Sequence, residues 1–188
     1  MNQTDEQLAE LIRHGNNDAF QELMRRYIGP IYGFSKQYVK SNEDAEDITQ
    51  DTLFKTWKHI KKFKAGKSFK PWIYTIARNT ALDHIKKKKA APFSDLDNPD
   101  QDTQFTDTLS DDEPSPSDIF EQAEKAGVLK NALETLHPDH RSIIVMHYHE
   151  EMTFQEIANV IDKPMNTVKS WHRRALSKLR THLNNRTK

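Results

Sequence analysis

Apolar side chains recur every three or four residues along most of this chain, which is the spacing of one face of an α-helix. Strand-like alternation is almost absent, so the pattern favours an all-α fold. Gly15 should end the first helix, whose stripe consists of Leu8, Leu11 and Ile12. The next helix should open at Asp18, because Asp18 and Gln21 resemble a capping pair, and Gly29-Pro30 should kink or break it.

Two further stripes complete the first part of the chain. Ser41 and Asp44 fit a capping box for a third helix, and Pro71 suits the first turn of a fourth helix. The inner side of the third helix should consist of Ile48, Thr52, Leu53, Thr56, Trp57 and Ile60, and that of the fourth helix of Trp72, Ile73, Ile76, Ala77 and Thr80. We therefore expect a helical domain over residues 1–91.

A second set of helical stripes follows residue 118. The patterns predict helices over residues 119–136 and 141–148. Thr153 and Glu156 then fit another capping box, and the tight turn DKPM separates that helix from a last one that opens at Thr167. Two helices joined by a short turn are typical of a helix-turn-helix, so residues 119–188 should form a second helical domain.

Charge separates along the chain although the formal net charge is zero. Residues 1–89 hold 17 Lys and Arg against 11 Asp and Glu, residues 90–119 hold none against 9, and residues 120–188 hold 11 against 8. The acidic middle is rich in Pro, Ser and Asp and has too little apolar surface to offset chain entropy. We therefore expect residues 92–118 to form a flexible linker, which is either a passive solvated loop or an active tether.

Composition limits the remaining classes of function. The 188 residues include no Cys, which excludes disulfides and thiolate metal sites and suits a reducing cytoplasm. The polar start MNQTDEQ does not resemble a signal peptide, and the longest apolar run, SIIVM, is too short for membrane insertion. His147 and His149 diverge on a helix, so we expect no metal site, and nothing in the sequence indicates a cofactor or a small-molecule substrate.

The segment from Phe54 to Lys89 concentrates positive charge and aromatic rings. It carries 12 Lys and Arg and a single acid, Asp83. Phe63 and Phe69 flank the basic loop KAGKS, and a polar stripe on the fourth helix consists of Thr75, Asn79, Asp83 and Lys86. Cations, stacking rings and groups that can bind base edges suit single-stranded nucleic acid. The alternative is a solvated lysine-rich helix.

The last helix has a polar, basic face. Its members recur at helical spacing and have two polar residues at the N-terminal tip: Asn166, Thr167, Lys169, Ser170, Arg173 and Arg174. Donors for base edges combined with cations for phosphates are what a recognition helix needs in the major groove. The alternative is an ordinary helical hairpin with a solvated face. Trp171 should pack on the inner side or, if exposed, touch DNA.

An acidic ridge lies on the third helix and consists of Glu43, Glu46, Asp47, Gln50 and Asp51. One interpretation is a solvated helix whose acids favour its N-terminus. A second is the metal site of a nuclease, which needs acids that converge from several elements. A third is a docking ridge for a basic partner helix.

Three motifs together resemble one family. DAEDITQDTLFKTW, FKPWIYTIARNTALDHIKKKK, and FQEIANVI followed by NTVKSWHRRALSKLR occur in the order and spacing of the bacterial extracytoplasmic-function (group four) sigma factors. The resemblance spans residues 5–183. It implies a cytoplasmic, two-domain initiation factor without enzymatic activity, which binds core RNA polymerase and promoter DNA, serves stress responses and is held inactive by an anti-sigma factor.

The resemblance also implies roles for individual residues. The surface expected to bind the clamp helices of the polymerase β′ subunit consists of Asp44, Glu46, Asp47 and Gln50. The set expected to hold the melted minus-ten element consists of Lys61, Phe63, Lys64, Lys67, Phe69, Asn79, Asp83, Lys86 and Lys87, and the set expected to read the minus-thirty-five duplex consists of Asn166, Thr167, Lys169, Ser170, Arg173 and Arg174. The linker would thread the polymerase channel. The turn of the helix-turn-helix carries Asp162, where the family often has Gly.

One rival interpretation stays open at this point. A helix-turn-helix transcriptional regulator would bind duplex DNA as a dimer, without acting as a polymerase subunit. It leaves the composition of residues 54–89 unexplained.

Overall fold

A computed structural model describes residues 3–64, 66–90 and 129–184, and all regular structure within these ranges is helical, as the stripes predict. The elements are α1 (Asp5–Arg13), α2 (Asn17–Ser35), α3 (Asn42–His59), the short 3-10 helix η1 (Ile60–Lys62), α4 (Phe69–Ala90), α6 (Leu129–Glu134), α7 (Pro138–Tyr148), α8 (Phe154–Ile161) and α9 (Met165–Asn184). The expected linker 92–118 and the expected helical residues 119–128 lie outside the described residues. None of the described helices is long and apolar enough to cross a membrane.

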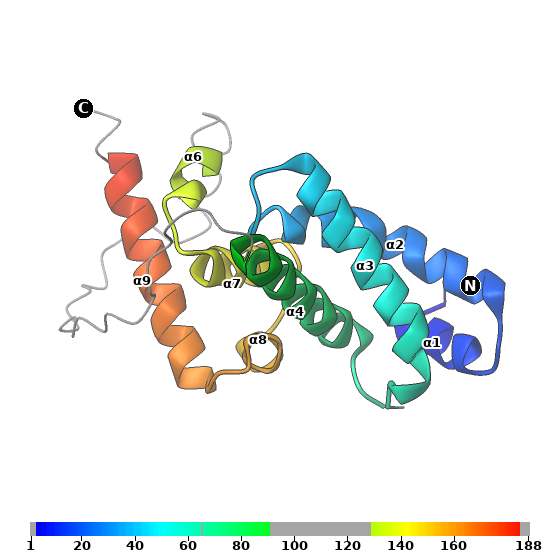
Figure 1. Cartoon of the computed structure of the whole chain (residues 1–188). Helices are drawn as coiled ribbons and strands as arrows, with labels where there is room; N and C mark the ends of the chain where they lie inside the picture. The colour runs from blue at the N-terminus through cyan, green and yellow to red at the C-terminus, as the bar shows by residue number, and fades with distance from the viewer. Residues whose placement is uncertain (1–2, 65, 91–128, 185–188) are drawn as a thin grey trace.

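Helix α4 is the central element of the structure. It packs against α1, α2 and α3, which together with α4 we call the N-terminal unit. It also packs against α8, which belongs with α6, α7 and α9 to the C-terminal unit. Figure 1 shows α4 in green between these two groups of helices. Since α4 contacts both units, one buried cluster spans them. It includes Ile157 and Ile161 of α8 together with Leu23 and Ile73 of the N-terminal unit.

The predicted apolar stripes form the cores. Leu23, Ile31, Ile48 and Ile73 are fully buried, and the ring of Phe34 meets that of Tyr74 edge to face at 5.0 Å. A smaller cluster joins α6, α7 and α9 through Ala132, Leu136, Ile144, Ala175 and Leu179.

The predicted capping residues were right at two helices and wrong at one. The side chain of Thr153 accepts from the Glu156 amide at 3.3 Å, and the Glu156 carboxylate accepts from the Thr153 amide at 2.9 Å, which completes a capping box. Ser41 caps α3. The prediction that Asp18 opens α2 was wrong, because Asn16 caps this helix and accepts from the Ala19 amide at 2.9 Å. Asp18 lies in the first turn, where the helix dipole favours an acid.

Of the kink or break predicted at Gly29-Pro30, the break does not occur, because α2 continues through Pro30 to Ser35. A proline inside a helix costs about 3 kcal/mol or more. The buried residues Tyr27, Ile31 and Phe34 continue the same face across this point. The free energy gained by burying these three side chains therefore exceeds the cost of Pro30 inside the helix.

The assignment of Trp57 to the core was wrong as well, since Trp57 is 54% exposed and its neighbour Phe54 is 58% exposed. The buried side of α3 consists of Ala45, Ile48, Thr49, Thr52 and Thr56. The hydroxyls of Thr52 and Thr56 are buried and donate to the carbonyls of Ile48 and Thr52, at 2.7 and 2.8 Å. Position 57 is one residue past this inner row and so turns outward.

Replacement of Thr153 by Ala should remove the capping box and lower the free energy of unfolding by about 1 kcal/mol. Urea denaturation followed by circular dichroism measures this change. Ser177→Ala, a substitution at an exposed position of α9, is the matched control. Equal stability of the two variants would contradict a stabilising role for the cap.

Candidate functional site

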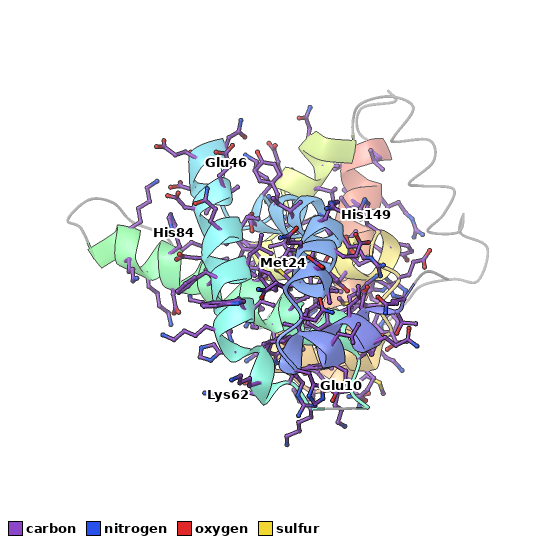
Figure 2. The ribbon with its side chains drawn as sticks, turned by 90° about the vertical axis from the view of Figure 1, so that its right-hand side faces the viewer. Glu10, Met24, Glu46, Lys62, His84 and His149 are labelled. Carbon is purple, nitrogen blue, oxygen red and sulfur yellow. The ribbon has the colours of Figure 1, made fainter. Side chains whose placement is uncertain are left out.

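The exposed face of α3 is longer than the acidic ridge. Glu46, Asp47 and Gln50 are exposed, as predicted for a docking surface. The spacing of three, four and three residues from Asp47 continues this face through Gln50 and Phe54 to Trp57, and the rings of Phe54 and Trp57 lie 6.1 Å apart. Figure 2 shows Glu46 near the upper end of α3, close to where this helix begins. The α3 face is therefore acidic in its first half and aromatic in its second.

Asp44 is separate from this face. Its carboxylate lies 3.1 Å from Nε2 of His84 and 2.7 Å from Nζ of Lys88, and its side chain is only 18% exposed. Lys88 above all, with His84, holds the pKa of Asp44 below its usual range. Asp44 thus ties the start of α3 to the last turns of α4.

The polar stripe of α4 reaches the surface. Asn79, Asp83, Lys86 and Lys87 are exposed, while Thr75 is partly buried. The lysines predicted before this helix, Lys61, Lys64 and Lys67, are exposed on the segment that joins α3 to α4. Most of the set predicted for single-stranded DNA therefore lies on the outside of one helix and its preceding loop.

Two members of that set are buried. Phe63 and Phe69 are 3% and 0% exposed. Their rings lie 5.5 Å apart, and each also packs against Trp72. The ring of Phe69 further meets Tyr27 at 5.3 Å. In this conformation both rings lie buried at the two ends of the basic loop, and neither has an exposed face on which a base could stack.

The predicted recognition helix α9 presents its basic face outward. Asn166, Lys169, Arg173 and Arg174 are exposed, and Thr167 and Ser170 are partly buried. The start of α9 follows Asp162, which has a left-handed backbone (φ 57°) of the kind that glycine adopts most easily.

Buried imidazoles hold α9 in place. Nε2 of His172 lies 3.2 Å from the Tyr148 hydroxyl, and burial lowers the pKa of His172 to about 4. Trp171 is partly buried and its ring lies 5.2 Å from that of His140, as expected for packing. Both contacts attach α9 to α7 through uncharged side chains and leave the basic side of α9 outward.

Sequence reasoning missed two groups of residues. The aromatic half of the α3 face was readable from the spacing 47, 50, 54 and 57, although Trp57 was assigned to the core. Lys70 and Arg78 of α4 contact Glu150 and Asp139 of the C-terminal unit. No local signal could have identified that contact, because the partners lie 80 and 61 residues away. Within the described ranges, no group of three His, Asp or Glu side chains could hold a metal ion.

Comparisons with known proteins give a consistent result. The chain matches the family model of Sigma-70 region 2 over residues 23–91 and that of Sigma-70, region 4 over residues 132–181. It is 28% identical over 167 residues to the RNA polymerase sigma-H factor of Pseudomonas aeruginosa, which covers 88% of this chain and 86% of that protein. It is 27% identical over 174 residues to the ECF RNA polymerase sigma factor SigW of Bacillus subtilis, which covers 92% of each.

Solved structures share the fold. One is CnrH in complex with the cytosolic domain of CnrY, with a TM-score of 0.68 and 23% identity over 96% of this chain and 97% of that chain. Another is the sigma factor RpoE in complex with the anti-sigma factor NepR from Bartonella quintana, with a TM-score of 0.62 and 21% identity over 88% of this chain and 96% of that chain.

Replacement of Asp44 by Asn should destabilise the protein at pH 7 and progressively less as the pH falls below about 4. The folded-state pKa of Asp44 is lowered, so its contribution is present above the unfolded pKa of about 3.9 and disappears as the pH falls through the folded value. Urea denaturation of wild type and variant across this range measures the difference. Asp51→Asn, at an exposed position of the same helix, is the control. A difference that stays constant with pH would contradict the ion pairs.

Proposed function

This chain belongs to the extracytoplasmic-function (ECF) sigma factors of the sigma-70 family, and we propose which of its surfaces carry out each part of that role. Sigma factors are non-catalytic subunits that direct RNA polymerase to promoters, so the chain acts in transcription initiation and is not an enzyme. The observation that carries the proposal is that both matched regions keep their predicted polar faces exposed.

We propose the α3 face as the site for core RNA polymerase, at the clamp helices of the β′ subunit. Glu46, Asp47 and Gln50 would orient a basic partner helix, since complementary charge mainly speeds and aligns association. Phe54 and Trp57 would supply the apolar contact area, as exposed aromatic residues commonly do at interfaces. Asp44 contributes indirectly, by fixing α3 to α4.

For promoter DNA we propose a division between the two units. The minus-ten element would be held as single strand by Asn79 and Asp83, with phosphate contacts from Lys61, Lys64, Lys67, Lys86 and Lys87. The buried Phe63 and Phe69 would support this surface and would stack on a base only after local rearrangement. The minus-thirty-five duplex would be read in the major groove by α9.

The wider assignments follow the family. We propose a polymerase-binding and minus-ten domain over residues 1–91, a linker over 92–118 and a minus-thirty-five domain over 119–188. Because the structures of CnrH and of RpoE are complexes, the latter with an anti-sigma factor, we also propose that an anti-sigma factor binds this chain. The cytoplasm, where RNA polymerase acts, is the proposed location.

Binding to core RNA polymerase, followed by run-off transcription on a promoter library, tests the function. Wild type should bind and initiate selectively. Asp47→Lys should weaken polymerase binding at least tenfold, because it places a positive charge opposite a basic partner helix. Trp57→Ala should do the same, because an interface tryptophan that acts as a hot spot contributes about 2 kcal/mol or more. Binding is measured by fluorescence anisotropy.

Asp18→Lys makes the same charge change at an exposed position of α2 and is the control. Polymerase affinity that is unchanged in both α3 variants would refute the docking site. No binding by the folded wild type would instead favour a regulator that binds duplex DNA alone.

Asn79→Ala should impair promoter opening more than closed-complex formation, because its exposed amide is placed to bind a base edge only after the strands separate. Permanganate footprinting reports the opened bases, and mobility shifts at low temperature report the closed complex. Thr181→Ala, at an exposed position of α9, is the control. Equal loss in both assays would count against a role in base recognition.

A further inference from the structure

A closed circuit of contacts joins α1 to the start of α4. The hydroxyl of Tyr27 on α2 donates to Oδ2 of Asp5 at 2.6 Å. The ring of Tyr27 meets that of Phe69, the first residue of α4, edge to face at 5.3 Å. The backbone amide of Phe69 then donates to Oε1 of Glu6 at 3.1 Å, which leads back to α1. Residues from three helices therefore fix one another in place.

Asp5 attaches the first turn of α1 to α2. Its carboxylate lies 2.9 Å from Nη1 of Arg26, and both side chains are partly buried. Arg26 also donates to the backbone carbonyl of Gln3 at 2.8 Å. Burial, and after it the hydrogen bond to Asp5, raises the pKa of Tyr27, so its hydroxyl stays protonated and remains a donor. The neighbouring Glu6 is thereby held at a defined place.

Glu6 supplies a group that the start of α4 needs. The first four backbone amides of a helix have no acceptor within that helix, and a negative charge near them is favourable. The first turn of α4 contains no acidic residue and carries Lys70. The Glu6 carboxylate, 63 residues away in the sequence, accepts from the first amide of α4. Glu6 is therefore a helix cap that a different helix provides.

The capped residue also ends the basic loop, so its position sets that of the loop. The rings of Phe63 and Phe69, at the two ends of the loop, lie 5.5 Å apart and both pack against Trp72. Helix α1 also contacts η1, which directly precedes Phe63. Figure 2 shows Glu10 of α1 and Lys62 of η1 at the same lower end of the molecule. Helix α1 thus contacts the elements on both sides of the basic loop.

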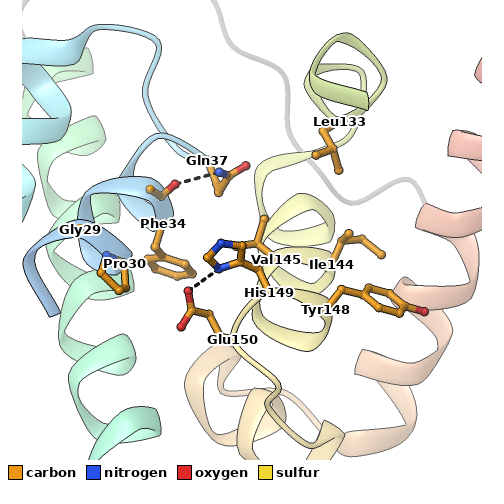
Figure 3. Close-up of a pocket in the computed structure, with 11 residues that line it drawn as sticks. Gly29, Pro30, Phe34, Gln37, Leu133, Ile144, Val145, Tyr148, His149 and Glu150 are labelled. Atoms are coloured by element: carbon orange, nitrogen blue, oxygen red, sulfur yellow. Dashed lines mark hydrogen bonds and ion pairs between the residues drawn. The ribbon is translucent and has the colours of Figure 1, made fainter. Parts of the chain in front are cut away.

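The apolar residues beneath the loop are closely packed. Leu8 of α1, Phe63 and Phe69 are almost fully buried and belong to one cluster. Looser packing lies elsewhere, at a cavity of about 590 Å³ between α2 and α7 that Pro30 and Val145 line (Figure 3). Close-packed side chains transmit a displacement instead of absorbing it. A shift of α1 therefore reaches the basic loop.

We propose that α1 is a positioning element of the minus-ten site, and that through Glu6 it holds the basic loop in the conformation that receives the melted strand. This inference rests on the proposed role of the loop, with Lys64 and Lys67, in minus-ten binding. Glu6 is a positioning residue, because it acts through the Phe69 amide and not on DNA. A loop that is competent for only part of the time binds more weakly in proportion to that fraction. Loss of Glu6 therefore weakens minus-ten binding although every DNA contact is still present.

Hydrogen exchange of the full-length chain, followed by NMR, tests the contact. Glu6 is exposed, so its replacement leaves the apolar core intact. Glu6→Ala should speed exchange of the Phe69 amide about fivefold or more, as expected for one lost hydrogen bond. Glu6→Gln keeps a side-chain oxygen that can accept this bond and should restore most of the protection.

Glu10→Ala is the matched control. Glu10 is an acid of the same helix, and its carboxylate pairs with Arg13 and His14 of α1 itself. This variant should leave exchange of the Phe69 amide at the wild-type rate. Equal exchange of that amide in wild type and Glu6→Ala would overturn the proposal.

A second measurement, on holoenzyme formed with core polymerase, tests the effect on the promoter. The probe is a single-stranded oligonucleotide with the minus-ten element of a promoter selected from the library. Glu6→Ala should weaken its binding about fivefold in fluorescence anisotropy, and Glu6→Gln should recover most of that loss. Binding of the minus-thirty-five duplex and of core polymerase should match wild type in both variants, which a general loss of stability would not allow.

The outcomes separate this inference from the proposed function. If the wild type does not bind core polymerase, the proposed function fails and the role of α1 at the promoter fails with it, while hydrogen exchange still shows whether the Glu6 contact exists. If holoenzyme forms but Glu6→Ala binds the minus-ten strand as wild type does, the positioning role alone is wrong. Equal losses for the minus-ten strand, the minus-thirty-five duplex and core polymerase would indicate general destabilisation and would also overturn the positioning role.

Discussion

Helix α4 packs against helices from both halves of the chain, and this double packing is the constraint on which the other features depend. One side of α4 buries Ile73 and Ala77 against α1, α2 and α3. Another side meets α8. Among the side chains of α4 that the structure describes, the exposed ones include Asn79 and Asp83 of the polar stripe. A helix with two covered sides can present a single polar surface in a fixed orientation, which a solvated lysine-rich helix could not do.

Ion pairs then decide which charges stay available. Asp44 holds Lys88, Asp139 holds Arg78, and Glu150 approaches Lys70, so three cations of α4 are engaged by acids from other elements. Lys86 and Lys87 remain exposed. A chain with no formal net charge can therefore keep strongly basic surfaces, because nine of its acids lie in the segment 90–119 and only Asp83 lies among the 12 Lys and Arg of residues 54–89.

Local sequence reasoning predicted the helices well, since their apolar period and their caps are properties of neighbouring residues. It was wrong at α2, where both Asn16 and Asp18 suit a cap and Pro30 continues the helix. It was also wrong at Trp57, which was assigned to the inner side although it lies one residue past the inward-facing Thr56. Thr52 and Thr56 lie inward as predicted, and their hydroxyls donate to carbonyls of their own helix.

The sequence by itself determined the all-α class, the two helices on either side of the DKPM turn and the family, because stripes, caps and motifs all lie within short stretches of chain. Only the tertiary structure decided that Phe63 and Phe69 are buried, that Asp44 belongs to an ion pair and that Arg78 faces Asp139. Each of these depends on contacts beyond the residue's own helix. The Asp44 and Arg78 partners lie 40 to 61 residues away, and no periodicity within one helix can specify what another helix brings to its surface.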